Sequence, residues 1–201
     1  PTSLIGVDQD PDSIRETTSR LGPRNNFRSI LSNFADVNSS STGLVDFALL
    51  DLGVSSHQLD HGPRGFSYRD LGPLDMRMSQ SGPTAADLLN GMSHDEIRAA
   101  LVSHGGEDYR VADRIAGSVA GARPVTTTGE LVEAVERVVP AWNKKSARKG
   151  RTKTMARGFQ ALRVMVNGEH LVLERVLKEV LPGIMRDGGG CRGAFVPEHG
   201  G

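Results

Sequence analysis

The sequence lacks several features that would assign it to a compartment or a class of partner. Cys191 is the single cysteine among 201 residues, so the chain forms no internal disulfide, which fits a reducing compartment. No apolar run approaches the roughly 20 residues that a membrane-spanning helix needs. No signal-peptide pattern opens the sequence. The 24 Lys and Arg residues balance 24 Asp and Glu residues, so overall charge indicates no partner.

What the sequence does contain, in its first 51 residues, is an alternation of strand and helix signals. The apolar run Leu4–Val7 ends at Asp8, and the strongest strand signal, Val45–Leu50, ends at Asp51. A further strand is expected at Phe27–Leu31. Strands that alternate with helices and end at acids are typical of an open parallel sheet with its site along the carboxyl edge. The sequence therefore predicts an α/β fold.

Helix signals bracket these strands and dominate the middle of the chain. Asp10 is expected to cap a helix over residues 11–21. Capping boxes at Ser93–Glu96 and Thr127–Glu130 each precede an amphipathic run. These signals predict a small helical subdomain inserted over residues 80–145.

Three stretches are expected to be interruptions. Ser39–Gly43 is predicted to be a linker. Leu52–Pro83 is long, irregular and rich in Gly, Pro, Asp and Arg, which is typical of a loop that is either functional or disordered. Asn167 and Gly168 are expected to interrupt or weaken the last helix.

Asp8, Asp10 and Asp12 alternate along the chain and invite a metal-binding interpretation. They do not form a calcium loop of the EF-hand type, because Ser13 replaces the glycine that the turn requires. A phosphatase-type nucleophile at Asp8 is an alternative. Position favours another role, since an acid that ends a strand in a nucleotide-binding unit can accept hydrogen bonds from both hydroxyls of a ribose. No metal site is predicted.

Phe34 follows the second predicted strand and has two possible roles. It can belong to the core, or it can form an apolar wall for an adenine ring. The residue alone does not decide between them.

The long loop and the last helix carry the most specific pattern in the chain. The matching segments are Asp51–Asp60, Arg64–Tyr68, Leu74–Met78, Thr84–Asp87, Arg114–Ala116 and Phe159–Val164 with Val166–Asn167. They closely resemble the MraW/RsmH family of methyltransferases, which modify N4 of a cytidine in small-subunit ribosomal RNA. The resemblance extends to about residue 180 and implies a class I, Rossmann-like methyltransferase sheet with the inserted helical subdomain.

The resemblance also implies roles for individual residues and a cofactor, S-adenosyl-L-methionine. Asp8 would bind the ribose hydroxyls of the cofactor, and Phe34 would lie against its adenine. Asp51 and Gln58 would complete the cofactor site near the methyl group. Asp51 is also the candidate catalytic residue, because an oxygen acceptor near the target amine can orient it and take its proton.

A basic segment between Trp142 and Arg157 is a candidate RNA contact. It holds seven Lys and Arg residues and no acid, which is the pattern of phosphate-backbone binding, although a solvated loop is the simpler alternative. The residues concerned are Lys144, Lys145, Arg148, Lys149, Arg151, Lys153 and Arg157. Arg64, Arg69 and Arg77 of the long loop are expected to extend the same surface.

Both ends depart from the family pattern. The chain starts at Pro1 near a strand, as a fragment or a processed product would, without the first strand and glycine-rich loop of the family, and it diverges from about residue 186. The resulting division is 1–79 for the first part of the methyltransferase domain, 80–145 for the insertion and 146–201 for a basic loop and the return to that domain. Val45–Leu50 is expected to lack both neighbouring strands, and the chain alone is expected to bind the cofactor weakly or not at all.

Small-subunit ribosomal RNA, or the small ribosomal subunit, is the expected partner, and no membrane association or oligomeric state is predicted. The resemblance implies a cytoplasmic location in bacteria and a mitochondrial or plastid location in eukaryotes. The alternative function is a non-catalytic RNA-binding module in ribosome assembly. RNA binding without cofactor binding would favour that alternative.

Overall fold

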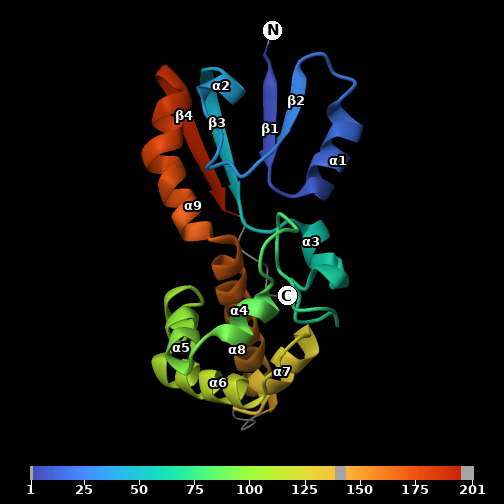
Figure 1. The fold of residues 1–201 in the computed structure, drawn as a ribbon, viewed down its shortest axis with the longest axis vertical. Coiled ribbons are helices and arrows are strands. Elements are labelled where there is room, and N and C mark those ends of the chain that lie inside the picture. The colour runs from blue at the N-terminus through green and yellow to red at the C-terminus, as the bar shows by residue number, and fades with distance from the viewer. Residues whose placement is uncertain (1, 139–143, 196–201) are drawn as a thin grey trace. The chain divides into compact units, whose positions relative to one another are not determined.

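The computed structural model describes residues 2–138 and 144–195. Contacts divide the chain into two compact units (Figure 1). The strand unit comprises residues 2–53, Met78–Ser81 and residues 168–195. The helical unit comprises the described residues of Val54–Arg77 and Gly82–Asn167. None of the described helices is both long enough and apolar enough to span a membrane.

The strand unit contains two pairs of parallel strands. In chain order its elements are β1 (Leu4–Asp8), α1 (Pro11–Leu21), β2 (Phe27–Leu31), α2 (Ser39–Thr42), β3 (Val45–Leu52), α9 (Glu169–Arg175), the π-helical turn η2 (Val176–Val180), α10 (Leu181–Ile184) and β4 (Met185–Phe195). β1 pairs with β2, and β3 pairs with β4. Helices combined with small parallel sheets confirm the α/β class. The sheet is present as two separate pairs in the described residues.

The first strand and helix form where the sequence predicts them. Asp10 caps α1, because its side chain accepts a hydrogen bond of 3.0 Å from the backbone N–H of Asp12. The predicted linker at Ser39–Gly43 is wrong, because Ser39–Thr42 forms the short helix α2. Asn38 caps α2 through hydrogen bonds from the N–H groups of the second and third helical residues. A side-chain cap therefore turns a polar segment into a helical turn.

The expectation that Val45–Leu50 lacks both neighbouring strands is wrong at one edge. Along that edge β4 pairs with β3, with Phe47 opposite Gly190 and Leu52 opposite Phe195. The register shifts just before Phe47, where the glycine run of β4 lies. A Cβ at Gly189 would lie only 3.0 Å from the carbonyl oxygen of Asp46, so glycine allows the close approach of the two strands.

One hydrophobic cluster forms the core of the strand unit. It joins the loop after β2 to η2 and α10, and its buried members are Ala35, Val37, Val176, Val180, Leu181 and Ile184. Ala48 and Leu50 of β3 pack against the cluster, whereas Phe47 and Leu49 on the same strand are 60% and 61% exposed. One face of β3 is therefore packed and the other is open to solvent.

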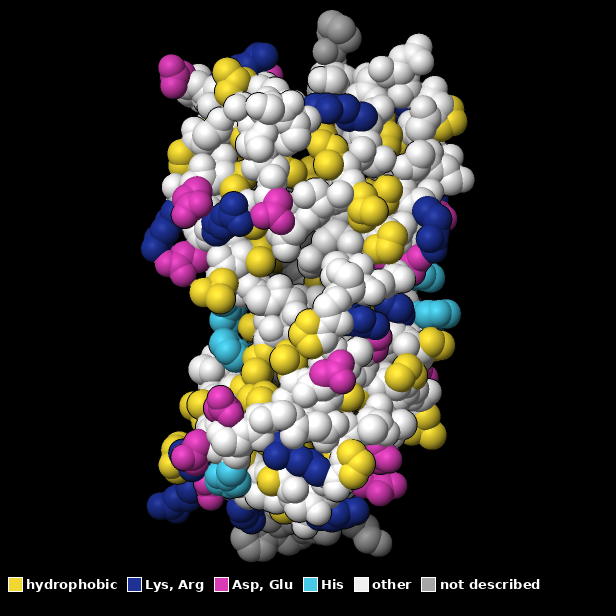
Figure 2. All heavy atoms as spheres, in the orientation of Figure 1, with side chains coloured by type: hydrophobic (Ala, Val, Ile, Leu, Met, Phe, Trp, Pro, Cys, Tyr) yellow, Lys and Arg dark blue, Asp and Glu magenta, His cyan; other side chains and the backbone are white. Residues whose placement is uncertain are grey.

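Over α9 and η2 the surface of the strand unit mixes both signs of charge. Figure 2 shows acidic and basic side chains interspersed over this part of the chain. Arg175 pairs with Asp36 at 3.0 Å and with Glu179 at 3.5 Å, and Lys178 pairs with Glu174. Among the described residues of α9 and η2, the charges of Arg175 and Lys178 are therefore balanced by neighbouring acids.

The helical unit is built on the predicted caps. Its elements are α3 (Ser56–Asp60), the 3-10 turn η1 (Gly62–Arg64), α4 (Ala85–Gly91), α5 (His94–Ser103), α6 (Tyr109–Gly121), α7 (Thr128–Glu136) and α8 (Lys144–Asn167). Both predicted capping boxes are confirmed, at the starts of α5 and α7. The predicted interruption at Asn167 and Gly168 is also confirmed, because α8 ends at Asn167 and Gly168 adopts a left-handed conformation with φ of 59°. That this unit is an insertion stays a prediction.

The basic segment differs from its predicted form. It was expected to be a loop, but the helix that carries Phe159 already begins at Lys144. Lys and Arg have high helix propensity, and this basic stretch contains no proline. The helix that carries Phe159 can therefore extend toward the N-terminus through the basic residues. Trp142, which adjoins the segment, lies outside the described residues.

Candidate functional site

Asp8 ends β1 at the carboxyl edge of the β1–β2 pair. Its side chain accepts a hydrogen bond of 2.8 Å from the backbone N–H of Asp10, and its backbone carbonyl accepts one of 3.0 Å from the N–H of Ser32, just after β2. Burial raises the pKa of Asp8, and the nearby Asp10 carboxylate adds to this, while hydrogen bonds from the Asp10 backbone and Ser13 oppose it. The result is a half-buried carboxylate held in place by the loop that follows it.

A pocket of about 440 Å³ opens at the carboxyl ends of β1 and β2. This volume falls within the roughly 300–1,000 Å³ typical of small-molecule sites. Its lining residues are Gln9, Pro11, Leu31, Ser32, Asn33, Ser79 and Ser81. The walls come from the residues after β1, the residues after β2 and the segment Met78–Ser81, and all three belong to the strand unit. The pocket has both polar and apolar walls, and its lining begins at Gln9, directly after Asp8. Such a pocket at the end of parallel strands suits a nucleoside.

None of the seven lining residues was predicted from the sequence as a site residue. Gln9 directly follows Asp8, and Asn33 directly precedes Phe34. Their positions next to predicted site residues could have indicated that they line the same site. Ser79 and Ser81 come from a segment about 70 residues away and carry no local signal of their own. Only the folding of the chain brings them to this pocket.

Phe34 lies in the loop that leads from β2 into the core. It is half-buried and packs against the core cluster that contains Ala35 and Val37. Its neighbour Asn33 lines the 440 Å³ pocket. The core interpretation of Phe34 therefore has structural support, and its role beside an adenine stays a prediction.

Asp51 and Gln58, predicted together, lie in different units. Asp51 is exposed on β3, opposite Ala194 of β4. Gln58 is buried, and its side-chain oxygen accepts a hydrogen bond of 3.0 Å from the N–H of Ser55, which closes the capping box of α3. The strand unit thus contains Asp8, Phe34 and Asp51, whereas Gln58 belongs to the helical unit.

The predicted RNA-contacting residues lie along the first half of α8. The structure describes the side chains of two of them, Lys153 and Arg157. Lys153 is exposed, whereas Arg157 forms an ion pair of 2.9 Å with the buried carboxylate of Glu107. The side chains of the remaining residues lie outside the described part of the structure, namely Lys144, Lys145, Arg148, Lys149 and Arg151. Arg157 therefore has a structural partner, and Lys153 is available to solvent.

The three arginines of the long loop contact their own loop. Arg77 binds both carboxylate oxygens of Asp75, at 2.8 and 2.7 Å. Arg64 donates a hydrogen bond of 3.0 Å to the backbone carbonyl of Arg77. The guanidinium of Arg69 lies 5.6 Å from the ring centre of Tyr68. These contacts order the loop, so the predicted RNA role of the arginines stays untested.

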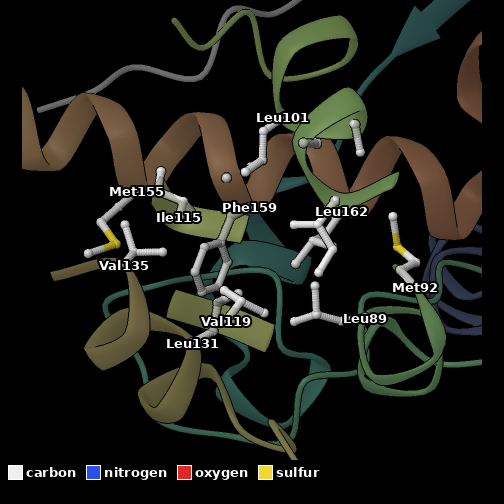
Figure 3. Close-up of a pocket in the computed structure, with 14 residues that line it drawn as sticks. Leu89, Met92, Leu101, Ile115, Val119, Leu131, Val135, Met155, Phe159 and Leu162 are labelled. Carbon is white, nitrogen blue, oxygen red and sulfur yellow. The ribbon is translucent and has the colours of Figure 1, made fainter. Parts of the chain in front are cut away.

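The helical unit contains a second, much smaller cavity of about 20 Å³ (Figure 3). In Figure 3 the ring of Phe159 extends from α8 toward Val119 and Leu131, and the labelled side chains carry only carbon and sulfur. A cavity of this size has room for about one water molecule, and apolar walls offer it no hydrogen bond. This cavity is part of the helical core and is not a ligand site. Among the described residues, no group of three or more His, Cys, Asp or Glu side chains could hold a metal ion.

Comparison with curated proteins finds similar chains named ribosomal RNA small subunit methyltransferase H. The chain is 42% identical to that of Symbiobacterium thermophilum, over 92% of this chain and 59% of the relative. It is 41% identical to that of Myxococcus xanthus, over 98% of this chain and 62% of the relative. It is 40% identical to that of Geobacter sulfurreducens, over 98% and 63%. The chain thus spans about three-fifths of the length of these relatives.

Comparison with protein families matches residues 1–191. The match continues past residue 186, where the sequence was expected to diverge, and includes the glycine run of β4. With nearly the whole chain matched, and with relatives at about 40% identity, the resemblance seen in the sequence is confirmed. The chain belongs to the MraW methylase family.

Proposed function

We propose that this chain is the part of a methyltransferase that binds the nucleoside portion of S-adenosyl-L-methionine and acts on the N4 amine of a cytidine in small-subunit ribosomal RNA. The observation that carries the proposal is the 440 Å³ pocket at the end of β1 and β2, in a chain of this family. Its lining includes Gln9, the residue that directly follows Asp8. The names of the relatives support the substrate class.

The residues around the pocket fit the nucleoside of this cofactor. Asp8 offers two oxygens to the two hydroxyls of a ribose, which is the geometry that a carboxylate serves well. Gln9 and Asn33 supply amide groups, and Leu31 and Pro11 supply apolar surface for a ring. Under this proposal Phe34 supports the ring side of the pocket from the adjoining core.

S-adenosyl-L-methionine, when bound, supplies an electrophilic methyl group. The part of the protein is to place the acceptor amine and to remove its proton. The amine of cytosine has a delocalised lone pair, so it must be oriented before it can react. Asp51 is exposed at the end of β3. Its proposed role is to accept a hydrogen bond from the N–H of that amine and then to take up its proton. The proposed role of Gln58 in the cofactor site rests on the family resemblance alone.

The helical unit is the proposed RNA-binding part, inserted in the methyltransferase domain. Its support is the basic first half of α8, where Lys153 is exposed. Basic residues without neighbouring acids bind phosphates and release counterions, so the binding should weaken steeply with salt. The proposed contacts are Lys144, Lys145, Arg148, Lys149, Arg151 and Lys153, with Arg157 as a structural neighbour.

The nucleoside site is tested with Asp8→Asn and S-adenosylhomocysteine, a stable product analogue. We expect the dissociation constant to rise about tenfold or more, because hydrogen bonds to a charged acceptor are each worth about 1.5–3 kcal/mol. Stability at pH 7 should not fall, since burial raises the pKa of Asp8 and the ionised carboxylate is the disfavoured form. Calorimetry and thermal unfolding measure the two effects.

A matched control is Asp46→Asn in the same unit, because Asp46 is exposed and pairs with Arg186 outside the pocket. It should leave affinity unchanged. Equal affinity of Asp8→Asn and the unmodified chain would contradict the proposed site. The reaction is tested by incubating the protein with small ribosomal subunits and a methyl-labelled donor, followed by nucleoside analysis. If the protein binds RNA but neither binds the nucleoside nor transfers the labelled methyl group, the result would support the alternative of a non-catalytic RNA-binding module in ribosome assembly.

A further inference from the structure

The segment Met78–Ser81 belongs to the strand unit although the residues on both sides of it belong to the helical unit. Side-chain hydrogen bonds from Met78 and Gln80 connect it to residues of the strand unit. Two of its four residues, Ser79 and Ser81, line the 440 Å³ pocket. The contacts that hold this segment therefore shape one wall of the pocket.

Gln80 makes two of these contacts. Its side-chain amide donates hydrogen bonds of 3.2 Å to Asp10 and 2.8 Å to Asp12. Asp10 is 1% exposed and also caps α1, so Gln80 binds a carboxylate whose position is already set by the helix. Hydrogen bonds to a charged acceptor are stronger than those between neutral groups.

The backbone of Gln80 is in an unusual conformation. Its φ is 59°, in the left-handed region that residues other than glycine rarely adopt. Such a conformation persists when surrounding contacts enforce it, and it is frequent at ligand sites. In Gln80 the side chain is held by the two hydrogen bonds to the start of α1.

A second chain of contacts joins the same segment to the opposite wall. The side chain of Asn33 donates to Gln9 at 3.2 Å, and that of Gln9 donates to the sulfur of Met78 at 3.4 Å. The hydroxyls of Ser79 and Ser81 lie 3.2 Å apart. All three walls of the pocket are therefore connected through side chains.

We propose that Gln80 is a positioning residue of the nucleoside pocket: it ties Met78–Ser81 to the first turn of α1 and so presents Ser79 and Ser81 to the ligand. This inference rests on the proposed function, because it takes a nucleoside as the ligand. Gln80 itself contacts the aspartates. The two serine hydroxyls are the groups that meet the nucleoside, as hydrogen-bond donors or acceptors.

The test uses nuclear magnetic resonance of the whole chain with free adenosine as the ligand, which reports weak binding as well as tight binding. Adenosine should shift the backbone signals of Gln9, Asn33, Ser79 and Ser81. In Gln80→Ala the shifts at the two serines should disappear, and the dissociation constant should rise about three- to tenfold, the effect of losing a modest set of hydrogen bonds. Gln80→Glu should weaken binding further, because it places a third carboxylate beside Asp10 and Asp12.

Two further variants separate positioning from folding. Gln80→Gly suits the left-handed backbone, so it should keep the thermal midpoint and still lose affinity. Ser19→Ala, exposed on α1, is the matched control and should change neither. A role confined to folding would instead lower the midpoint and leave adenosine affinity at the original value.

The outcomes distinguish this inference from the proposed function. If Gln9 and Asn33 respond to adenosine and the two serines do not, the inference is wrong and the nucleoside site stands. The same holds if Gln80→Ala and Gln80→Gly bind adenosine as the unmodified chain does. If no pocket residue responds, the proposed nucleoside site and the inference fail together.

Discussion

At the scale of single residues, the long loop of the helical unit is stabilised from within. Met76 is fully buried with φ of 61°, a conformation that its neighbours must enforce. Its N–H donates to the carbonyl of Arg64 at 3.0 Å, and its carbonyl accepts from the side chain of Asn167 at 2.9 Å. Beside it, Asp75 and Arg77 form the two-point ion pair. The residues of the family signature in this loop therefore stabilise the conformation of the loop, in addition to any role in function.

The ion pair predicts a pH-dependent contribution to stability. Burial alone would raise the pKa of Asp75, but the hydrogen bonds and charge of Arg77 outweigh it and lower the pKa below 3.8. A carboxyl group whose pKa is lower in the folded state stabilises the folded protein at pH values above the pKa of the unfolded state. This stabilisation is lost as the pH falls through the pKa of the folded state. Asp75→Asn should thus lower the free energy of unfolding by about 1–2 kcal/mol at pH 7. The difference should shrink below about pH 3.8, as denaturant titrations at several pH values would reveal.

The exposed Asp46 again provides the comparison. Asp46→Asn should change the free energy of unfolding by less than about 0.5 kcal/mol at any pH. A constant difference between Asp75→Asn and the unmodified chain from pH 7 to pH 3 would show that the carboxylate charge is not what stabilises the loop.

At the scale of elements, α8 serves two purposes along one helix. Its first half is basic, and its second half carries Phe159 and Leu162 into the core of the helical unit (Figure 3). Arg157 lies where the two halves meet and pairs with Glu107, whose side chain is 5% exposed. The other oxygen of that carboxylate has no hydrogen-bond partner among the described atoms. If Arg157 is removed, the buried carboxylate of Glu107 therefore has few other groups to compensate its charge.

Two substitutions on α8 separate these purposes. Arg157→Ala should destabilise the protein by about 2–3 kcal/mol, because it leaves a buried carboxylate without its cation. Lys153→Ala should change stability by less than about 0.5 kcal/mol and should reduce the salt dependence of RNA binding by about one counterion. Denaturant unfolding and RNA titrations across salt concentrations measure these effects. Loss of RNA affinity from Arg157→Ala alone, at unchanged stability, would reverse the two assignments.

At the scale of the whole molecule, each unit has a core of its own. The strand unit packs around Val176 and Ile184, and the helical unit packs around Phe159. Phe159→Ala should destabilise the helical unit by about 3–5 kcal/mol through the cavity that it leaves. Hydrogen exchange should then quicken for amides of α5, α6 and α7, while those of β1 and β2 keep their protection. Equal loss in both units would mean that the chain unfolds as a single cooperative block.

The sequence by itself determined the features that act over one turn or one strand. The caps at Asp10, Ser93 and Thr127 and the break at Gly168 appear where the residues predict them. Local signals succeed here because a side chain satisfies backbone groups only two or three residues away. Family membership was also readable, since it depends on the order of residues.

Only the tertiary structure decided how distant segments meet. It placed Ser79 and Ser81 in the wall beside Gln9, gave β3 a partner in β4, and packed Phe34 against the core. These outcomes depend on which apolar surfaces bury one another and which strand edges remain to be paired, and neither is encoded within a short window. The acid at the end of β1 was therefore predictable, whereas most of the pocket beside it was not.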